Sequence, residues 1–174
     1  MPPTTLKVLV IGPKSSGKTT IANFLAGHQD RLGGQEQYQP TVAVRILETE
    51  CNKASVELWD VSGDQIYEAC WPAIIKDAQG VLLVYNPESH SHESEAMLWY
   101  EWFVTNPGLN PSAQCLIFAH TATTTKSSST VSKLRVKANR IASAFDTPSV
   151  IKSEYEKFAD SLSEYIETQH RQRK

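Results

Sequence analysis

The residues Gly12 to Thr19 read G-P-K-S-S-G-K-T and follow the apolar run Leu6 to Ile11. The spacing G-x-x-x-x-G-K-[ST] after a strand is typical of a loop that binds nucleotide phosphates. The glycines let successive backbone N–H groups point into one concavity, and a helix that begins near Gly17 adds its positive dipole end. We expect Lys18 to contact the β- and γ-phosphates and the Thr19 hydroxyl to ligate Mg²⁺. The segment therefore predicts a nucleoside triphosphate site.

Two shorter motifs lie beside the next pair of strand-like runs. Tyr38-Gln39-Pro40-Thr41 precedes a pair of strand-like runs, and Trp59-Asp60-Val61-Ser62-Gly63 closes the second run. Asp60, at a strand end, can hold a Mg²⁺-bound water, and Gly63 lets its backbone N–H approach the γ-phosphate. The role of Thr41 is implied by the family resemblance given below: it would ligate Mg²⁺ only when a triphosphate is bound, so its loop is expected to order and disorder with the nucleotide.

The elements that position these residues follow from the apolar periodicity. Apolar runs alternate with helical patterns, which predicts a single α/β domain over residues 1–174 with a mostly parallel sheet of about six strands. Asn52-Lys53 indicates a hairpin, so one strand is expected to be antiparallel. Predicted strands span 6–12, 42–51, 54–60, 80–85, 114–119 and part of 134–142; predicted helices span 17–27, 91–105 and a last one that starts at Thr147. The segments 28–40 and 121–132 are predicted to be flexible loops.

Composition excludes several classes of function. A net charge of −2 gives no electrostatic reason to expect a nucleic acid partner. Cys51, Cys70 and Cys115 lack metal-ligand spacing and fit a reducing compartment. No apolar run reaches membrane-spanning length and no lipidation motif is present, so we expect no direct membrane anchor. We also expect the isolated protein to be a monomer. Helix 91–105 is apolar around most of its circumference, which leaves open whether one or two of its aromatic residues face a protein partner.

Together the motifs resemble those of Ras-like small GTPases. The segment at Thr41 is similar to their switch I, and Asp60 to Gly63 is similar to the D-x-x-G of switch II, with a Rab-like Trp-Asp pair. Further stretches are similar to the Rab-like small GTPases of the intraflagellar transport B complex. These are Ala22-Asn23-Phe24-Leu25, Val44-Arg45-Ile46-Leu47-Glu48, Glu57-Leu58-Trp59-Asp60, Cys70-Trp71-Pro72-Ala73, Lys76-Asp77-Ala78, Trp99-Tyr100, Gln114-Cys115 and Ala119-His120.

This resemblance runs from about residue 6 to residue 120 and carries several expectations. It implies a Ras-like fold that binds GTP or GDP with Mg²⁺. It also implies a role in building cilia or flagella, with docking on coiled-coil subunits of the transport complex. The protein would then be found at the cilium or flagellum and basal body, with a cytoplasmic pool.

Two departures from the Ras-like pattern bear on hydrolysis. Asp64 stands where the family has the glutamine that positions the attacking water, and Gln65 follows it, so both are only weak catalytic candidates. A carboxylate near the γ-phosphate adds like-charge repulsion and cannot orient water through an amide. We therefore predict turnover at or below the unaided Ras rate of about 10⁻⁴ s⁻¹. Lys14 replaces a family glycine and could neutralise γ-phosphate charge, occupy the space of an arginine finger, or point into solvent.

A third departure concerns the base. Ala119-His120-Thr121-Ala122 stands where the family has N-K-x-D, and Ala122 cannot accept the guanine hydrogen bonds. His120 is expected to stack on the base, and Ser143-Ala144 is similar to the S-A-K motif, with Phe145 in place of its lysine. Guanine discrimination should therefore be weak, which leaves ATP open as a ligand. The predicted nucleotide-binding residues are Gly12, Lys14, Ser15, Ser16, Gly17, Lys18, Thr19, Thr20, Thr41, Gly63, His120, Ser143 and Ala144.

Four classes of function have to be compared with the phosphate-binding loop. The leading hypothesis is a nucleotide-loaded adaptor with very slow hydrolysis, and the alternative is a conventional GTP-hydrolysing switch in which Gln65 or an activating protein restores turnover. A small-molecule kinase would need arginines in a mobile lid, and residues 121–132 contain none. A protein that binds no nucleotide conflicts with the intact pair Lys18 and Thr19.

Overall fold

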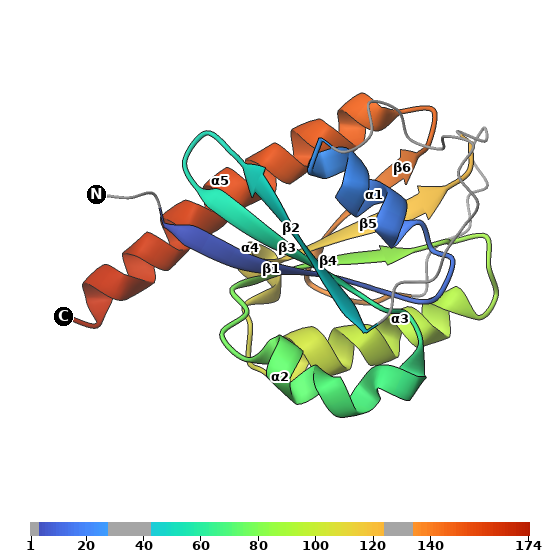
Figure 1. Cartoon of the computed structure of the whole chain (residues 1–174), viewed down its shortest axis with the longest axis horizontal. Coiled ribbons are helices and arrows are strands. Elements are labelled where there is room, and N and C mark those ends of the chain that lie inside the picture. Colours follow the sequence, from blue (N-terminus) through green and yellow to red (C-terminus); the bar gives the residue numbers. More distant parts are fainter. Residues whose placement is uncertain (1–3, 28–42, 124–133) are drawn as a thin grey trace.

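The computed structural model describes residues 4–27, 43–123 and 134–174, and a six-stranded sheet lies at its centre. The strands lie in the order β2-β3-β1-β4-β5-β6 (Figure 1). They are β1 (Thr5–Ile11), β2 (Val44–Glu50), β3 (Ser55–Val61), β4 (Gly80–Tyr85), β5 (Cys115–Thr121) and β6 (Asn139–Ala144). Only the β2–β3 pair is antiparallel among these strands. The predicted α/β fold with one antiparallel strand is confirmed.

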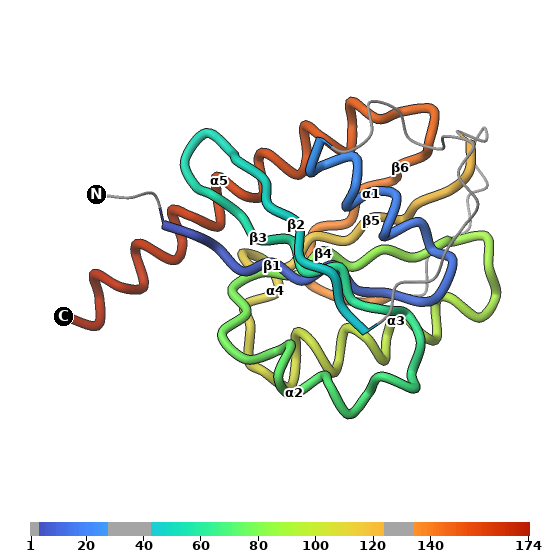
Figure 2. The backbone as a smooth tube through the Cα atoms, in the orientation of Figure 1, coloured from blue at the N-terminus to red at the C-terminus, as the bar shows by residue number. Residues whose placement is uncertain are grey.

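Helices cover both faces of the sheet. They are α1 (Lys18–Leu25), η1 (Gln65–Cys70), α2 (Trp71–Ile75), α3 (His92–Tyr100), which continues into the wider turn η2 (Glu101–Thr105), α4 (Pro111–Gln114) and α5 (Pro148–Gln172). Helices α1 and α5 lie on one face, and α2 and α3 lie on the other (Figure 1). The backbone trace in Figure 2 shows α5 running past the edge of the sheet at its C-terminal end. None of the described helices has the length and apolarity needed to cross a bilayer.

Each face of the sheet has its own apolar core. The core under α5 includes Ile151, Tyr155 and Leu162, which recur at helical spacing along one face of that helix. The other core is aromatic, because Trp71 of α2 packs on Trp99 of α3 with ring centroids 4.8 Å apart. A strand with helices on both faces is buried throughout, as every residue of β4 is here.

Helix α3 is less uniformly buried than its composition predicted. Trp99 is 2% exposed and Phe103, in the following turn, is 1% exposed. Leu98 and Trp102, one helical turn apart, are 51% and 45% exposed. Only Trp102 of the aromatic residues in this segment therefore lies substantially at the surface.

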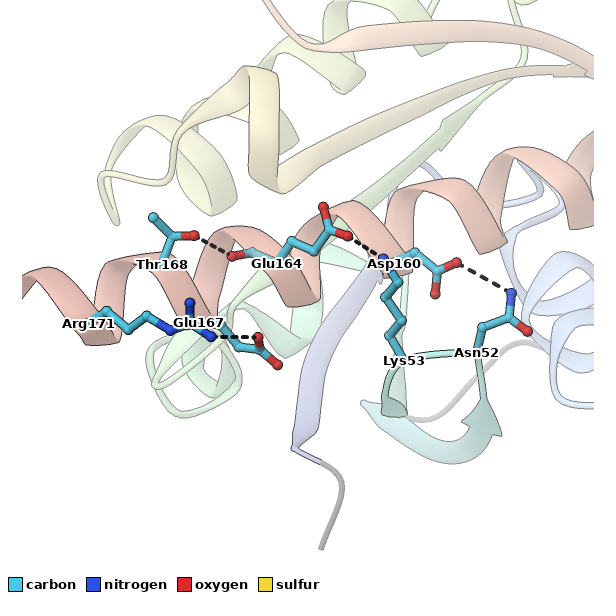
Figure 3. A network of polar contacts seen from close by, with 7 residues as sticks. All are labelled: Asn52, Lys53, Asp160, Glu164, Glu167, Thr168 and Arg171. Atoms are coloured by element: carbon cyan, nitrogen blue, oxygen red, sulfur yellow. Dashed lines mark hydrogen bonds and ion pairs between the residues drawn. The ribbon is translucent and has the colours of Figure 1, made fainter. Parts of the chain in front are cut away.

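The β2–β3 hairpin is fastened to α5. The hydroxyl groups of Thr49 and Tyr155 lie 2.6 Å apart in a buried contact. At the tip of the hairpin, Asn52 Nδ2 donates to Asp160 Oδ2 over 3.4 Å, and Lys53 pairs with Glu164 (Figure 3). These contacts hold β3, whose C-terminal end carries Asp60, against the long helix.

Two predicted boundaries were wrong. The last strand starts at Asn139, inside the predicted range, but ends at Ala144, beyond the predicted limit of residue 142. Residues 134–138 before it form an irregular connection in which Leu134 and Ala138 pack into the aromatic core. Thr121 belongs to β5 rather than to the loop, since it pairs with Ala144. The rest of the predicted loop 121–132, apart from residues 122 and 123, and the predicted loop 28–40 lie outside the described residues.

Candidate functional site

The predicted phosphate-binding loop lies between β1 and α1, at the carboxyl end of the sheet. Gly12 has a φ of +145°, and a Cβ built on it would lie 2.0 Å from the carbonyl oxygen of Val84 in β4. Only glycine fits so close to a neighbouring strand. Ser15 adopts a left-handed conformation with a φ of +58°, and Gly17 with a φ of +94° leads into α1. The loop thus curls around the N-terminus of α1, where backbone N–H groups favour an anion.

Lys18 lies inside this curl rather than in solvent. The residue is 5% exposed, and its ammonium donates to the carbonyl oxygen of Pro13 over 3.0 Å. Burial lowers the pKa of Lys18 to about 8, and the charges of Asp60 and Glu95 oppose this shift. At pH 7 the amine is therefore still mainly protonated but has lost much of its hydration. Such a cation gains strongly from a bound anion.

Two of the three residues predicted to serve Mg²⁺, Thr19 and Asp60, are in contact. The Thr19 hydroxyl donates to Asp60 Oδ2 over 2.9 Å, and Asp60 is fully buried at the end of β3. A guanidinium nitrogen of Arg45, in β2, lies 3.4 Å from the same carboxylate oxygen. The same nitrogen donates to Asn23 Oδ1 over 2.6 Å. A hydroxyl and a carboxylate are the hard oxygen donors that Mg²⁺ prefers, so these residues fit the ion.

The metal donors supplied by side chains are few. The described residues contain no group of three or more His, Cys, Asp or Glu side chains that could hold a metal by themselves. A Mg²⁺ ion at Thr19 would therefore need phosphate oxygens and waters to complete its shell. This requirement couples the metal to the nucleotide.

The switch II segment closes over the phosphate-binding loop. A Cβ built on Gly63 would lie 2.5 Å from the backbone nitrogen of Lys14 and 2.6 Å from Lys18 Nζ. Lys14 Nζ pairs with Asp64 Oδ2 over 2.8 Å. The hydrogen bond from Lys14 and one from the Ile66 backbone N–H lower the pKa of Asp64. Lys14, Lys18 and Gly63, all predicted to bind the nucleotide, therefore lie close together.

This convergence opens onto a cleft of about 500 Å³. Its lining residues are Lys14, Gly63, Asp64, Gln65, His92 and Glu95. His92 and Glu95 come from α3 and were not predicted, because nothing in the local sequence shows that the start of α3 faces switch II. The Asn86 backbone N–H donates to His92 Nδ1 over 3.1 Å, so the neutral imidazole carries its proton on Nε2.

His120 is placed differently from the prediction. It is 2% exposed, its Nδ1 lies 3.0 Å from Ser143 Oγ, and the edge of its ring meets Phe145. A Cβ built on Gly17 would lie 2.8 Å from His120 Cδ2. The predicted stacking on a base is therefore corrected, because the ring fills the junction between the phosphate-binding loop, β5 and β6. Burial lowers the pKa of His120 to about 4, so the ring is neutral at pH 7.

The remaining predicted residues fall into three groups. Ser16 and Ser143 are buried near this junction, with exposures of 3% and 5%, and Ala144 closes β6 beside Thr121. Thr20 is half-buried in the first turn of α1, next to Thr19. Thr41 lies outside the described residues. Arg45, which contacts Asp60, was missed because its role depends on the pairing of β2 with β3.

Comparisons with known proteins agree with this geometry. A family model described as the Roc (Ras of Complex) domain of DAP kinase matches residues 7–122. A zebrafish (Danio rerio) protein named Intraflagellar transport protein 22 homolog is 46% identical over 124 residues, which cover 66% of this chain and 65% of that protein. The human protein of the same name is 45% identical over 123 residues, which cover 66% and 64%. The match thus spans less than two thirds of the length of these relatives.

Solved structures add a match over nearly the whole chain. The GTP-bound T. brucei IFT22/74/81 complex contains a chain with a TM-score of 0.74 and 29% identity, covering 98% of this chain and 99% of that one. The GDP-bound T. brucei IFT22 structure matches with a TM-score of 0.63, also at 29% identity, over 97% and 99% of the two chains. With its family model matched over more than half its length, the chain belongs to the Ras-like Roc family of small GTPase domains and is similar, within that family, to the intraflagellar transport 22 proteins.

Proposed function

We propose that this chain is a guanine-nucleotide-binding adaptor subunit of an intraflagellar transport complex. The observation that carries the proposal is the convergence of Lys18 Nζ, the Lys14 backbone nitrogen and Gly63 at the start of α1. A γ-phosphate bound at this point would take hydrogen bonds from the cation and from backbone N–H groups of both segments. Thr19 and, through water, Asp60 would hold Mg²⁺ beside it. The ion would neutralise phosphate charge there.

The proposed partners follow from the relatives rather than from a surface of this chain. The matched T. brucei structure is a complex named for subunits 22, 74 and 81. We propose that this chain docks in the same way on coiled-coil subunits of its own transport complex. It would act at the cilium or flagellum and basal body, with a cytoplasmic pool, and would be monomeric when isolated.

Slow hydrolysis is the second part of the proposal. In the described conformation Asp64 is engaged twice, by the Lys14 ammonium and by the Ile66 backbone N–H. Neither contact lets the carboxylate orient a water for attack on phosphorus. Turnover should therefore stay at or below about 10⁻⁴ s⁻¹, the scale of unaided Ras.

Weak guanine discrimination is the third part. His120 is buried as a structural residue, and the residues that follow it, Thr121 to Thr123, carry no carboxylate to accept the two guanine N–H bonds. The hydrogen bonds lost with a carboxylate are charge-assisted, each worth about 1.5–3 kcal/mol. Guanine would still be bound, chiefly through its shape and the phosphates. The comparisons favour GTP and GDP over ATP, since the matched structures contain those nucleotides.

A conventional switch enzyme remains the second candidate, favoured by one observation. Gln65 lines the cleft next to Lys14 and Gly63, so a shift of the loop could bring its amide to the attacking water. In that case an activating protein would raise the hydrolysis rate by orders of magnitude.

The deciding experiment measures the nucleotides released from the purified, denatured protein by chromatography. Mainly GTP supports the slowly hydrolysing adaptor, and mainly GDP supports the switch enzyme. A single-turnover hydrolysis assay on reloaded protein then gives the rate directly. Purified protein that contains no nucleotide and cannot be loaded with Mg-GTP or Mg-GDP contradicts the proposal. Co-purification with coiled-coil subunits of the transport complex tests the adaptor role separately.

A further inference from the structure

We propose that Lys14 and Asp64 form a latch that distinguishes GTP from GDP. Lys14 pairs with Asp64 when no γ-phosphate is present, and its ammonium moves to contact the γ-phosphate when GTP binds. The inference rests on the proposed nucleotide binding and adds to it the residues that sense the third phosphate. It also gives a role to Lys14 and Asp64, two of the substitutions by which this chain departs from the Ras-like pattern.

The first step is the position of the pair. Lys14 is the third residue of the phosphate-binding loop, and Asp64 directly follows Gly63 of switch II. Their charged atoms meet at 2.8 Å across the mouth of the cleft, with side-chain exposures of 56% for Lys14 and 26% for Asp64. The ion pair thus bridges the two segments between which a γ-phosphate would bind.

The second step is the closeness of the two segments. A Cβ built on Gly63 would lie 2.5 Å from the Lys14 backbone nitrogen and 2.8 Å from the Pro13 carbonyl carbon. A γ-phosphate that accepts hydrogen bonds from both Lys18 Nζ and the Gly63 N–H must lie between these groups. Gly63 and the adjoining Asp64 therefore have to move outward when GTP binds, whereas GDP lacks the group that would push them. The closed conformation is the one that suits GDP.

The third step is the competition for the ammonium. Lys14 carries a compact point charge on a flexible stem, so it can change partners without moving the loop. An ion pair between partly exposed side chains is weak. A γ-phosphate offers more negative charge and several acceptor oxygens in the same region, beside an already buried Lys18. The transfer of Lys14 to the phosphate therefore favours GTP and releases switch II from the loop.

The fourth step links the latch to the surface. Asp64 Oδ1 accepts a hydrogen bond from the Ile66 backbone N–H over 3.1 Å and so caps the short helix η1. Ile66 is 75% exposed, a large value for an isoleucine. When Asp64 moves outward, the first turn of η1 and the Ile66 side chain move with it. The γ-phosphate would in this way change an apolar surface of the protein.

The test compares dissociation constants for GDP and a non-hydrolysable GTP analogue in the full chain. Asp64→Asn should raise the preference for the GTP analogue over GDP by about fivefold, because the ion pair that competes with the γ-phosphate for the Lys14 ammonium is removed. Lys14→Ala should lower that preference by about tenfold, because the γ-phosphate loses a charge-assisted hydrogen bond. In the double variant, Asp64→Asn should have no further effect.

The double variant separates the latch from simple repulsion. If Asp64→Asn raises the GTP preference equally with and without Lys14, the carboxylate only repels the phosphate and the latch is overturned. An unchanged preference in Lys14→Ala overturns it as well. Lys14→Arg should keep much of the GTP preference. Lys53→Ala breaks a comparable ion pair at the hairpin tip (Figure 3) and should change neither constant.

Failure of the proposed function has a different signature. Wild-type protein that binds neither nucleotide contradicts nucleotide binding itself and the latch with it. If wild-type protein binds both nucleotides and Lys14→Ala leaves its preference for GTP over GDP unchanged, only the latch is contradicted. Both residues are partly exposed, so the variants are expected to fold, and thermal unfolding of each variant checks this directly.

Discussion

The two ends of the candidate nucleotide site are built in different ways. At the phosphate end, two separate segments meet: the Thr19 hydroxyl donates to Asp60, and Gly63 lies close to Lys18 Nζ. At the base end, the prominent polar residue, His120, is buried between Gly17, Ser143 and Phe145. One end presents groups to a ligand, and the other uses its polar residue for internal packing.

This difference separates affinity from specificity. Phosphate recognition uses a cation and backbone N–H groups, which are indifferent to the base that the phosphates carry. Base recognition needs an acceptor aimed at the base edge, and a buried neutral imidazole held by a serine does not supply one. A chain can therefore keep nucleotide binding while its discrimination between bases weakens.

The largest expected effect is at the phosphate end. Lys18→Ala removes the buried cation and should weaken GTP and GDP binding by more than about 100-fold, because several charge-assisted hydrogen bonds are lost together. Equilibrium binding of a fluorescent guanine nucleotide measures it. Lys53→Ala, which removes a lysine from the hairpin tip, is the matched control. Binding within threefold of wild type in Lys18→Ala would show that the phosphates do not bind in this loop.

At the base end, the expected effect is a pH dependence of the folding stability. His120 has a pKa of about 4 in the folded protein and an ordinary value near 6.5 when unfolded. The unfolded chain therefore binds more protons between these values, so stability should fall as pH drops from about 6.5 to 4, by about 3 kcal/mol at most. Urea unfolding across this range measures the loss.

The contribution of His120 is isolated by difference. Carboxylates also titrate in acid, so the comparison is between wild type and His120→Asn, whose curve should be flatter between pH 6.5 and 4. Parallel curves for the two proteins would mean that the imidazole is charged or solvated in the folded state. A direct NMR titration of the ring gives the same answer independently.

Metal dependence sharpens the phosphate end further. Thr19→Ala removes the hydroxyl beside Asp60 and should weaken nucleotide binding about tenfold in Mg²⁺, on the scale of other lost metal-site contacts. In excess EDTA the variant and wild type should bind alike. Thr168→Ala, on the exposed side of α5, serves as the hydroxyl control. An equal loss in Mg²⁺ and EDTA would assign Thr19 to the phosphates or to folding instead.

An effect of about the same size as that of Thr19→Ala is expected on base discrimination. The burial of His120 against the phosphate-binding loop suggests that the N-K-x-D register starts at His120, which puts Thr123 at the aspartate position. We then expect Thr123→Asp to raise the preference for GTP over ATP about tenfold, through charge-assisted hydrogen bonds. Ala122→Asp is the paired control, because it puts a carboxylate where the alignment of Ala119 to Ala122 with N-K-x-D would place it. A larger gain in Ala122→Asp than in Thr123→Asp would support that alignment instead.

Much of this architecture could be predicted because the signals are local. The loop Gly12 to Thr19 is contiguous, so its spacing alone dictates a turn that wraps the start of a helix. The β2–β3 hairpin follows from alternating apolar residues on both sides of Asn52 and Lys53. By contrast, the last strand runs to Ala144, beyond the predicted range, because its end is set by its pairing with Thr121 of β5.

The sequence by itself determined the fold class, the phosphate-binding loop and the absence of a guanine-binding carboxylate near Ala122. Only the tertiary structure decided which groups meet. The pairing of Lys14 with Asp64 depends on how β3 lies beside β1, and the burial of His120 depends on the register that sets it opposite Ser143. A contiguous motif dictates its own geometry through backbone sterics, whereas contacts between distant segments are set by how the sheet aligns them.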